Sequence, residues 1–202
     1  MTGREKVLSR VNSALAPLGR RAQLPDFDAG SAAPDGLAGE GGTEAVFMDR
    51  IRSVNGEAVS GPAAAAARLR AGGWMRGYCD PALWPGLAPH FGPDFDVALE
   101  FDRSRVDDYA FGITRAAGAI AETGTIILED ATTSRRLAAL APWVHVAAIP
   151  RSRIHATLAE ALAALGGDPN VIWVTGPSKT ADVEGILIEG VHGPGVQIAL
   201  LL

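Results

Sequence analysis

Apolar positions first follow a helical period and later form short runs separated by turns. Residues 19–44 contain many Gly, Pro, Asp and Ala without a sustained period, so we expect an irregular arm there. We therefore divide the chain into a helix and arm over residues 1–44 and a main domain over residues 45–202. The spacing predicts an amphipathic helix over 4–18, with an apolar stripe of Val7, Leu8, Val11, Leu15 and Leu18.

The main domain alternates strand and helix patterns. Gly61-Pro62 precedes an alanine-rich run that stops at Gly72, which predicts a helix. Strands that alternate with helices imply right-handed crossovers, so we predict an α/β fold with an open, mainly parallel sheet and helices on both faces. Strands are predicted at 74–78, 97–101, 111–114, 125–128, 144–149, 171–175 and 196–201, and further helices at about 133–141, 153–165 and 180–189.

Composition narrows the class of protein. No apolar run approaches the roughly 20 residues of a membrane-spanning helix, and the charged first residues do not resemble a secretory signal. The single cysteine, Cys79, excludes an internal disulfide and a four-cysteine iron–sulfur cluster, which suits a cytoplasmic protein. A net charge of −5 argues against nucleic acid or an anionic membrane as partner, but does not exclude a small acidic ligand at one local site.

The segment from Val171 to Thr180 suggests an anion site. Gly176-Pro177 ends a predicted strand, and Ser178, Lys179 and Thr180 stand where a helix should begin. Free backbone N–H groups, a helix dipole, a lysine and hydroxyls would suit a phosphate or a carboxylate. It is not a Walker loop, because two of the required glycines are missing. The alternative is an ordinary capped helix with a surface lysine.

Two further side chains could carry chemistry. Glu122 lies between the apolar stretch 119–121 and the compact turn 123–125, where burial would suit it to proton transfer or nucleophilic attack. Alternatively, its carboxylate accepts backbone hydrogen bonds of that turn. His192 is flanked by small residues that leave room for a ligand, although one isolated histidine gives no metal site. His90, His145 and His155 are interpreted as structural or surface residues.

Three segments, AIAETGTI at 119–126, TGPSKTADVE at 175–184 and GVHGPG at 190–195, closely resemble the lactate-utilization protein C family, also called the LUD domain. The resemblance extends from residue 95 to the C-terminus. It implies a Rossmann-like variant of the fold shared by ribose-phosphate isomerase, glucosamine-phosphate deaminase and CoA transferases. It also implies Glu122 and His192 as catalytic candidates, and a ligand-binding set of Thr123, Gly124, Gly176, Ser178, Lys179, Thr180 and Asp182.

The resemblance further implies a cytoplasmic component of an L-lactate utilization system, which supports oxidation of L-lactate to pyruvate together with iron–sulfur proteins. One cysteine cannot hold such clusters, so we expect no cofactor on this chain and a role as an accessory or ligand-binding subunit. The alternatives are an independent isomerase or CoA-transferase-like enzyme with Glu122 as base or nucleophile, acting on a small phosphorylated or carboxylated metabolite, and a pure interaction module. Whether the chain is itself an enzyme stays open.

A parallel sheet poses a difficulty for these candidates. The 176–182 turn follows its strand, whereas Glu122 and His192 precede theirs. The two groups would then lie at opposite sheet edges, roughly 17 to 20 Å apart for strands of typical length. A single site therefore requires an antiparallel strand, an unusual loop path or a second subunit. Without one of these, the carboxyl-edge turn is the expected pocket.

Overall fold

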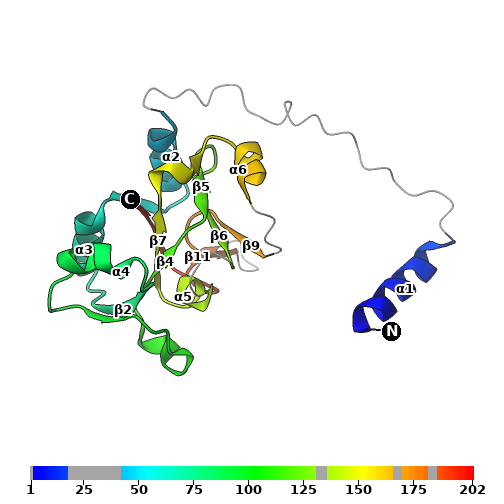
Figure 1. Ribbon diagram of the computed structural model, residues 1–202, viewed down its shortest axis with the longest axis horizontal. Helices are drawn as coiled ribbons and strands as arrows, with labels where there is room; N and C mark the ends of the chain where they lie inside the picture. The colour runs from blue at the N-terminus through cyan, green and yellow to red at the C-terminus, as the bar shows by residue number, and fades with distance from the viewer. Residues whose placement is uncertain (1, 18–41, 131–135, 166–169, 182–185) are drawn as a thin grey trace. The chain divides into compact units, whose positions relative to one another are not determined.

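The computed structural model describes residues 2–17, 42–130, 136–165, 170–181 and 186–202 (Figure 1). Contacts divide the chain into two units, residues 1–33 and 34–202, and each is described by itself. The first unit holds α1 (Gly3–Leu15), which confirms the predicted N-terminal helix. A capping box starts it: Glu5 N donates to Thr2 Oγ1, and Thr2 N donates to Glu5 Oε2. No α1 residue is buried, and in the described part of the chain no helix is long and apolar enough to cross a membrane.

The second unit is built on a six-stranded sheet in which every neighbouring pair is parallel. This sheet confirms the predicted fold class. The predicted strands occur within a few residues of their expected bounds, and the sheet gains a strand at 57–60 that the sequence pattern did not suggest. In spatial order the strands are β1 (Glu57–Ser60), β12 (Val196–Leu201), β7 (Val144–Ile149), β4 (Phe111–Arg115), β2 (Arg76–Cys79) and β3 (Asp96–Ala98).

Helices cover both faces of this sheet, because its central strands are apolar on both sides. Along β7, Val144, Val146 and Ala148 face one core cluster, whereas Ala147 and Ile149 face the other. The first face carries α3 (Pro62–Ala71), the predicted alanine-rich helix, with α4 (Trp84–Leu87) and η2 (Ala88–His90); the second carries α2 (Gly42–Ser53) and α5 (Arg136–Leu140). The 3-10 turn η3 (Arg103–Asp108) precedes β4.

A second, four-stranded sheet packs on the second face, and the sequence did not predict it as a separate layer. Its order is β8-β5-β6-β9, and β6 runs antiparallel to both neighbours. Figure 1 shows this sheet and its covering helix on the side away from α3 and α4. The elements are β5 (Gly118–Ile120), β6 (Thr125–Glu129), β8 (Ile154–His155), β9 (Val171–Val174) and the helix α6 (Leu158–Ala164).

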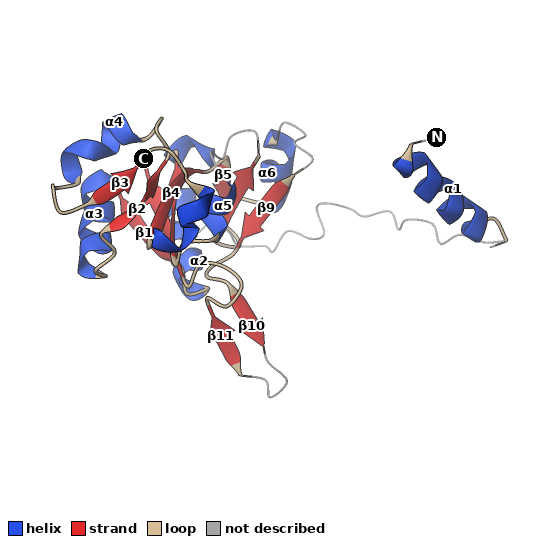
Figure 2. Cartoon of the chain, turned by 90° about the horizontal axis from the view of Figure 1, so that it is seen from below, coloured by secondary structure: helices blue, strands red, loops and turns tan. Residues whose placement is uncertain are grey.

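The predicted helix at 180–189 is wrong. The chain forms an antiparallel hairpin of β10 (Lys179–Ala181) and β11 (Leu187–Glu189), which projects from the sheets in Figure 2. The β-branched Thr180 and Ile188 face each other across it, and such residues favour extended backbone over helix. Residues 182–185, Asp182 among them, lie outside the described residues.

The predicted helix at 153–165 is only partly confirmed. Its first residues form η4 (Arg151–Arg153) and the short strand β8, and α6 begins at Leu158. Thr157 Oγ1 caps α6 by accepting a hydrogen bond from Glu160 N, and Glu160 Oε2 accepts one from Ala156 N. This capping signal was present in the sequence, three residues after the point where the apolar period begins. The predicted start of α5 at 132–134 lies outside the described residues.

Candidate functional site

The family-like segments meet because β6 and β9 are antiparallel. Ile126 of β6 pairs with Val174 of β9, so the start of one strand lies beside the end of the other. Thr125 Oγ1 is 2.8 Å from Thr175 Oγ1, and Thr123 Oγ1 is 2.7 Å from Thr125 Oγ1. The turns at 123–125 and 175–178 are therefore neighbours. The antiparallel strand that brings them together is one of the arrangements that a single site required.

The segments around Ser178 and His192 line one hollow, which we call the amino-edge hollow because β7 and β12 begin beside it. Its volume is about 260 Å³. Ser178 N donates to Pro194 O at 2.9 Å, and Gly190 N donates to Ser178 O at 2.8 Å, so the two segments are joined by their backbones. Its lining includes Thr175, Gly176, Ser178, His192 and Gln197.

Glu122 has a structural partner. Its carboxylate is half-buried, and Oε1 accepts a hydrogen bond from Leu158 N at 2.6 Å, at the first residue of α6. The alternative prediction, that the carboxylate accepts a backbone hydrogen bond, thus agrees with the structure in kind. The donor, however, belongs to α6 and not to the 123–125 turn. Glu122 is not among the residues that line the amino-edge hollow. Its catalytic role stays a hypothesis that the geometry does not require.

Two motif glycines and Lys179 attach the second sheet to the end of α2. A Cβ on Gly124 would lie 2.5 Å from Ile51 N, and one on Gly176 would lie 2.1 Å from Val54 O. Lys179 Nζ donates to Val54 O at 3.0 Å. No helix begins at 178–180, so the helix dipole cannot contribute to an anion site there, and the ligand role of Ser178, Lys179 and Thr180 stays a prediction without that support.

A buried polar network lies beneath α5. His145 Nε2 is 2.9 Å from Thr114 Oγ1, and His145 Nδ1 is 3.0 Å from Gln197 Oε1. Burial lowers the pKa of His145 to about 4, although the hydrogen bond to Gln197 acts in the opposite direction. The ring is therefore neutral at pH 7 and holds three strands together, which agrees with the structural role inferred for His145 from the sequence.

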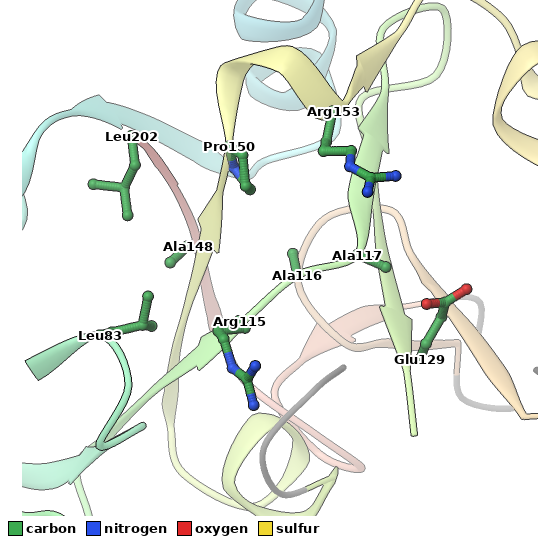
Figure 3. A pocket seen from close by; sticks show the side chains of 9 residues that line it. All are labelled: Leu83, Arg115, Ala116, Ala117, Glu129, Ala148, Pro150, Arg153 and Leu202. Carbon is green, nitrogen blue, oxygen red and sulfur yellow. The ribbon is translucent and has the colours of Figure 1, made fainter. Parts of the chain in front are cut away.

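A second hollow lies at the opposite edge, where β4, β7 and β12 end, and we call it the carboxyl-edge hollow. Open parallel sheets bind ligands at this edge. Its volume is about 300 Å³, and its polar side chains are Arg115, Glu129 and Arg153. Figure 3 shows Ala116 and Ala117 crossing the middle of the hollow, with Arg153 above Ala117 and the Glu129 carboxylate extending from below. The apolar wall consists of Leu83, Ala116, Ala117, Ala148, Pro150 and Leu202.

The two arginines differ in electrostatic state. Arg115 Nε donates to Asp80 Oδ2 at 2.6 Å, and the Asp80 side chain is only 2% exposed, so the charge of Arg115 is largely balanced. Arg153 is exposed, and no described residue makes a hydrogen bond or an ion pair with its guanidinium. Arg153 is therefore the cation that can bind a ligand without breaking an internal pair. Glu129 is 9% exposed and already makes an interaction of its own, but its two carboxylate oxygens have room for a further hydrogen bond.

Sequence reasoning missed these side chains, although a usable signal existed. Arg115 ends the apolar run 111–114, and Arg153 follows the strand 144–149 by four residues. Applying the carboxyl-edge rule to these central strands, and not only to 171–175, would have selected both. Within the described ranges no cluster of three His, Cys, Asp or Glu side chains could hold a metal ion. Burial raises the pKa of Cys79 to about 12, so its thiol is protonated at pH 7.

Comparisons with known proteins identify the family. A lactate utilization protein C of Deinococcus radiodurans is 40% identical over 88 residues, which cover 41% of each chain. The Bacillus subtilis protein of that name is 34% identical over 99 residues, covering 45% of this chain and 41% of its own. The matches thus span about two fifths of these curated relatives.

Comparison with solved structures leads to the same family. A crystal structure of a DUF162 family protein from Deinococcus radiodurans matches with a TM-score of 0.60 and 27% identity, over 79% of this chain and 96% of that one. The sequence pattern of the LUD domain matches residues 87–202, which is more than half of the chain. This chain therefore belongs to the LUD domain family.

Proposed function

We propose that this chain is a cytoplasmic component of an L-lactate utilization system, and that the carboxyl-edge hollow is its binding site for a small organic anion. Similar proteins of Deinococcus radiodurans, Bacillus licheniformis and Bacillus subtilis are named lactate utilization protein C, which supports the lactate role. In this proposal the chain supports oxidation of L-lactate to pyruvate together with iron–sulfur partner proteins.

The arrangement of Arg153 and Glu129 is the observation that carries the anion site. A guanidinium binds a carboxylate through two parallel N–H donors, and Arg153 has no internal partner among the described residues. Glu129, in the same hollow, offers an acceptor to a hydroxyl group. A cation beside a hydroxyl acceptor suits a 2-hydroxy acid, the class to which lactate belongs.

The chain's own chemistry supports an accessory or ligand-binding role. Cys79 is buried and its pKa is raised to about 12, so it is unsuited to bind iron, which needs an accessible thiolate. Any iron–sulfur cluster in the system then belongs to a partner. The chain would bind the organic acid while the partner carries the electrons.

Growth on a single carbon source tests the lactate role. A strain without the gene should fail to grow on L-lactate but grow on glucose. Wild-type chain and Arg105→Ala should restore growth, because Arg105 pairs with Asp108 outside the hollow, whereas Arg153→Ala should not. Normal growth of the deletion strain on L-lactate would refute the lactate role, and full rescue by Arg153→Ala would refute the anion site.

The partner proposal has a separate test. The tagged chain is purified from cells grown on L-lactate, and the eluate is examined by mass spectrometry and visible absorbance. Co-purification of proteins with the absorbance of iron–sulfur clusters supports an accessory subunit. Recovery of the chain alone, repeated at low salt, contradicts it and favours an independent enzyme.

A further inference from the structure

A second hollow adjoins the carboxyl-edge hollow and shares part of its lining. The second has a volume of about 230 Å³ and shares Ala117, Glu129 and Arg153 with the first. It adds His155 of β8, together with Ile127, Ala164 and Leu165. Arg153 and Glu129 therefore lie at the junction of two lobes, where one ligand could contact both side chains and extend in either direction.

Lactate does not fill this space. Its six non-hydrogen atoms, even at about 30 Å³ each, the volume of a water molecule in the liquid, occupy less than about 200 Å³. The first lobe alone measures about 300 Å³. A bound lactate would leave the second lobe, with its histidine, to solvent.

The polar groups of the two lobes differ in kind. Apart from the shared Arg153 and Glu129, the first lobe has one polar side chain, Arg115, and the rest of its wall is apolar. In the second lobe His155 is half-buried, with its ring lying against Gly118. An imidazole in that position can donate a hydrogen bond to an acidic group, and Arg153 can reinforce the same group from the junction. Glu129 disfavours an acidic group at its own position and accepts a hydroxyl instead.

We propose that the two lobes bind one hydroxy acid with a second acidic group, either carboxylate or phosphate. The carboxylate and hydroxyl of its lactate-like end bind between Arg115, Arg153 and Glu129. The second acidic group binds between Arg153 and His155. The inference rests on the proposed anion site and specifies the class of acid that fills it. In such an acid a carboxylate, a hydroxyl group and a second acidic group follow one another along the molecule.

Calorimetric titration with matched probes tests this inference. L-malate is L-lactate with a carboxylate on its methyl carbon, and 3-phospho-L-glycerate carries a phosphate ester on that carbon with the same configuration at the hydroxyl carbon. We expect at least one of the two to bind tenfold or more tightly than L-lactate and inorganic phosphate. The preferred probe tells whether the second group is carboxylate or phosphate.

Variants locate the second acidic group. His155→Ala should weaken the preferred probe about tenfold and leave L-lactate unchanged, whereas Arg153→Ala should weaken both. His155→Gln, which keeps a side-chain donor, guards against a loss caused by misfolding, and His90→Ala is the control on an exposed histidine. Thermal unfolding of each variant confirms that it folds.

The outcomes separate the inference from the proposed function. Equal binding of L-lactate and both larger acids, or no effect of His155→Ala, overturns the two-lobe inference and leaves the anion site standing. If none of the probes binds, the inference is overturned together with the anion site. The lactate role is decided independently by growth of the deletion strain.

Discussion

Thr125 and Thr175 are joined through their side chains, with 2.8 Å between the hydroxyl oxygens, although fifty residues separate them along the chain. The contact lies where β6 begins and β9 ends, and Thr123 extends it by a further hydrogen bond. Three hydroxyl groups thus connect two turns whose sequences both match the family. Because Thr125 is buried, water cannot easily replace this contact.

A double-mutant cycle measures this connection. Thr125→Val and Thr175→Val should each lower the free energy of unfolding by about 1 kcal/mol, and the double variant should cost less than their sum by about 0.5 to 1 kcal/mol. Denaturant unfolding of the four proteins gives the coupling. Strict additivity of the two losses would show that the hydroxyls do not interact in solution.

Gly176 combines a positive φ with a close approach to α2. Its φ is 76°, and an added Cβ would lie 2.1 Å from Val54 O; Gly73 has a φ of 72° and open space around it. Gly73→Ala should therefore cost only the left-handed strain, about 1 kcal/mol, while Gly176→Ala should cost about 3 kcal/mol or more. Thermal unfolding of both variants gives the comparison. Equal losses would mean that the Val54 contact relaxes freely.

Substitutions at Glu122 distinguish capping from catalysis. Glu122→Gln keeps an oxygen for Leu158 N, so its stability should stay within about 0.5 kcal/mol of the wild type, whereas Glu122→Ala should lose about 1 kcal/mol, as other helix caps do. Binding of L-malate and growth on L-lactate should be unchanged in Glu122→Gln. Loss of growth by a stable, ligand-binding Glu122→Gln protein would instead support the catalytic hypothesis.

The buried His145 makes stability depend on pH. Its pKa is about 4 in the folded chain against an ordinary value of 6.5, so between these values the unfolded chain binds more protons. The free energy of unfolding should therefore fall as the pH is lowered from 6.5 to 4, by up to about 1.4 kcal/mol per pH unit.

Comparison of variants isolates this contribution. Denaturant unfolding at pH 7 and pH 5 should show a smaller difference in His145→Gln than in the wild type, whereas the exposed His90→Gln should keep the wild-type difference. His145→Gln should also be less stable at pH 7, because it disturbs the hydrogen bonds to Thr114 and Gln197. An unchanged pH dependence in His145→Gln would exclude the histidine as its source.

The sequence predicted the parallel sheet because each central strand is a short apolar run, buried on both faces. The strand period carries no information about pairing partners, however. That β9 joins β6 in a separate antiparallel sheet depends on contacts between residues about fifty positions apart, such as Ile126 with Val174. This pairing is what places the family-like turns together.

The local sequence pattern also gave a wrong prediction where tertiary contacts determine the backbone conformation. Residues 180–189 have apolar positions compatible with a helix, yet Lys179 is held by Val54 O and Thr180 pairs with Ile188 in a hairpin. Arg153 follows the predicted strand 144–149 by four residues, but the sequence does not show which strand ends lie beside one another. Only the meeting of the ends of β4, β7 and β12 with the second sheet creates the hollow that it lines.

Asp80 controls the charge that the carboxyl-edge hollow presents to a ligand. Its buried carboxylate accepts from Arg115 Nε and from Ala82 N. In Asp80→Asn the amide oxygen can still accept from Ala82 N, but Arg115 loses its counter-charge. We expect a loss of about 1.5 to 3 kcal/mol in the free energy of unfolding, because the amide NH2 at the position of Oδ2 cannot accept from Arg115 Nε and the charge-assisted hydrogen bond is lost.

The same change should strengthen anion binding, because the ligand then meets the full charge of Arg115 as well as that of Arg153. At an effective dielectric constant of about 20, one uncompensated charge near the ligand should raise affinity about threefold or more. Titration of L-malate into Asp80→Asn measures this, with Asp94→Asn, whose partner is Arg70 on α3, as the matched control. The gain should shrink at high salt, since Arg115 is partly exposed. A fall in affinity would show that Asp80 acts mainly by holding Arg115 in position, and that position rather than charge limits binding at this edge of the sheet.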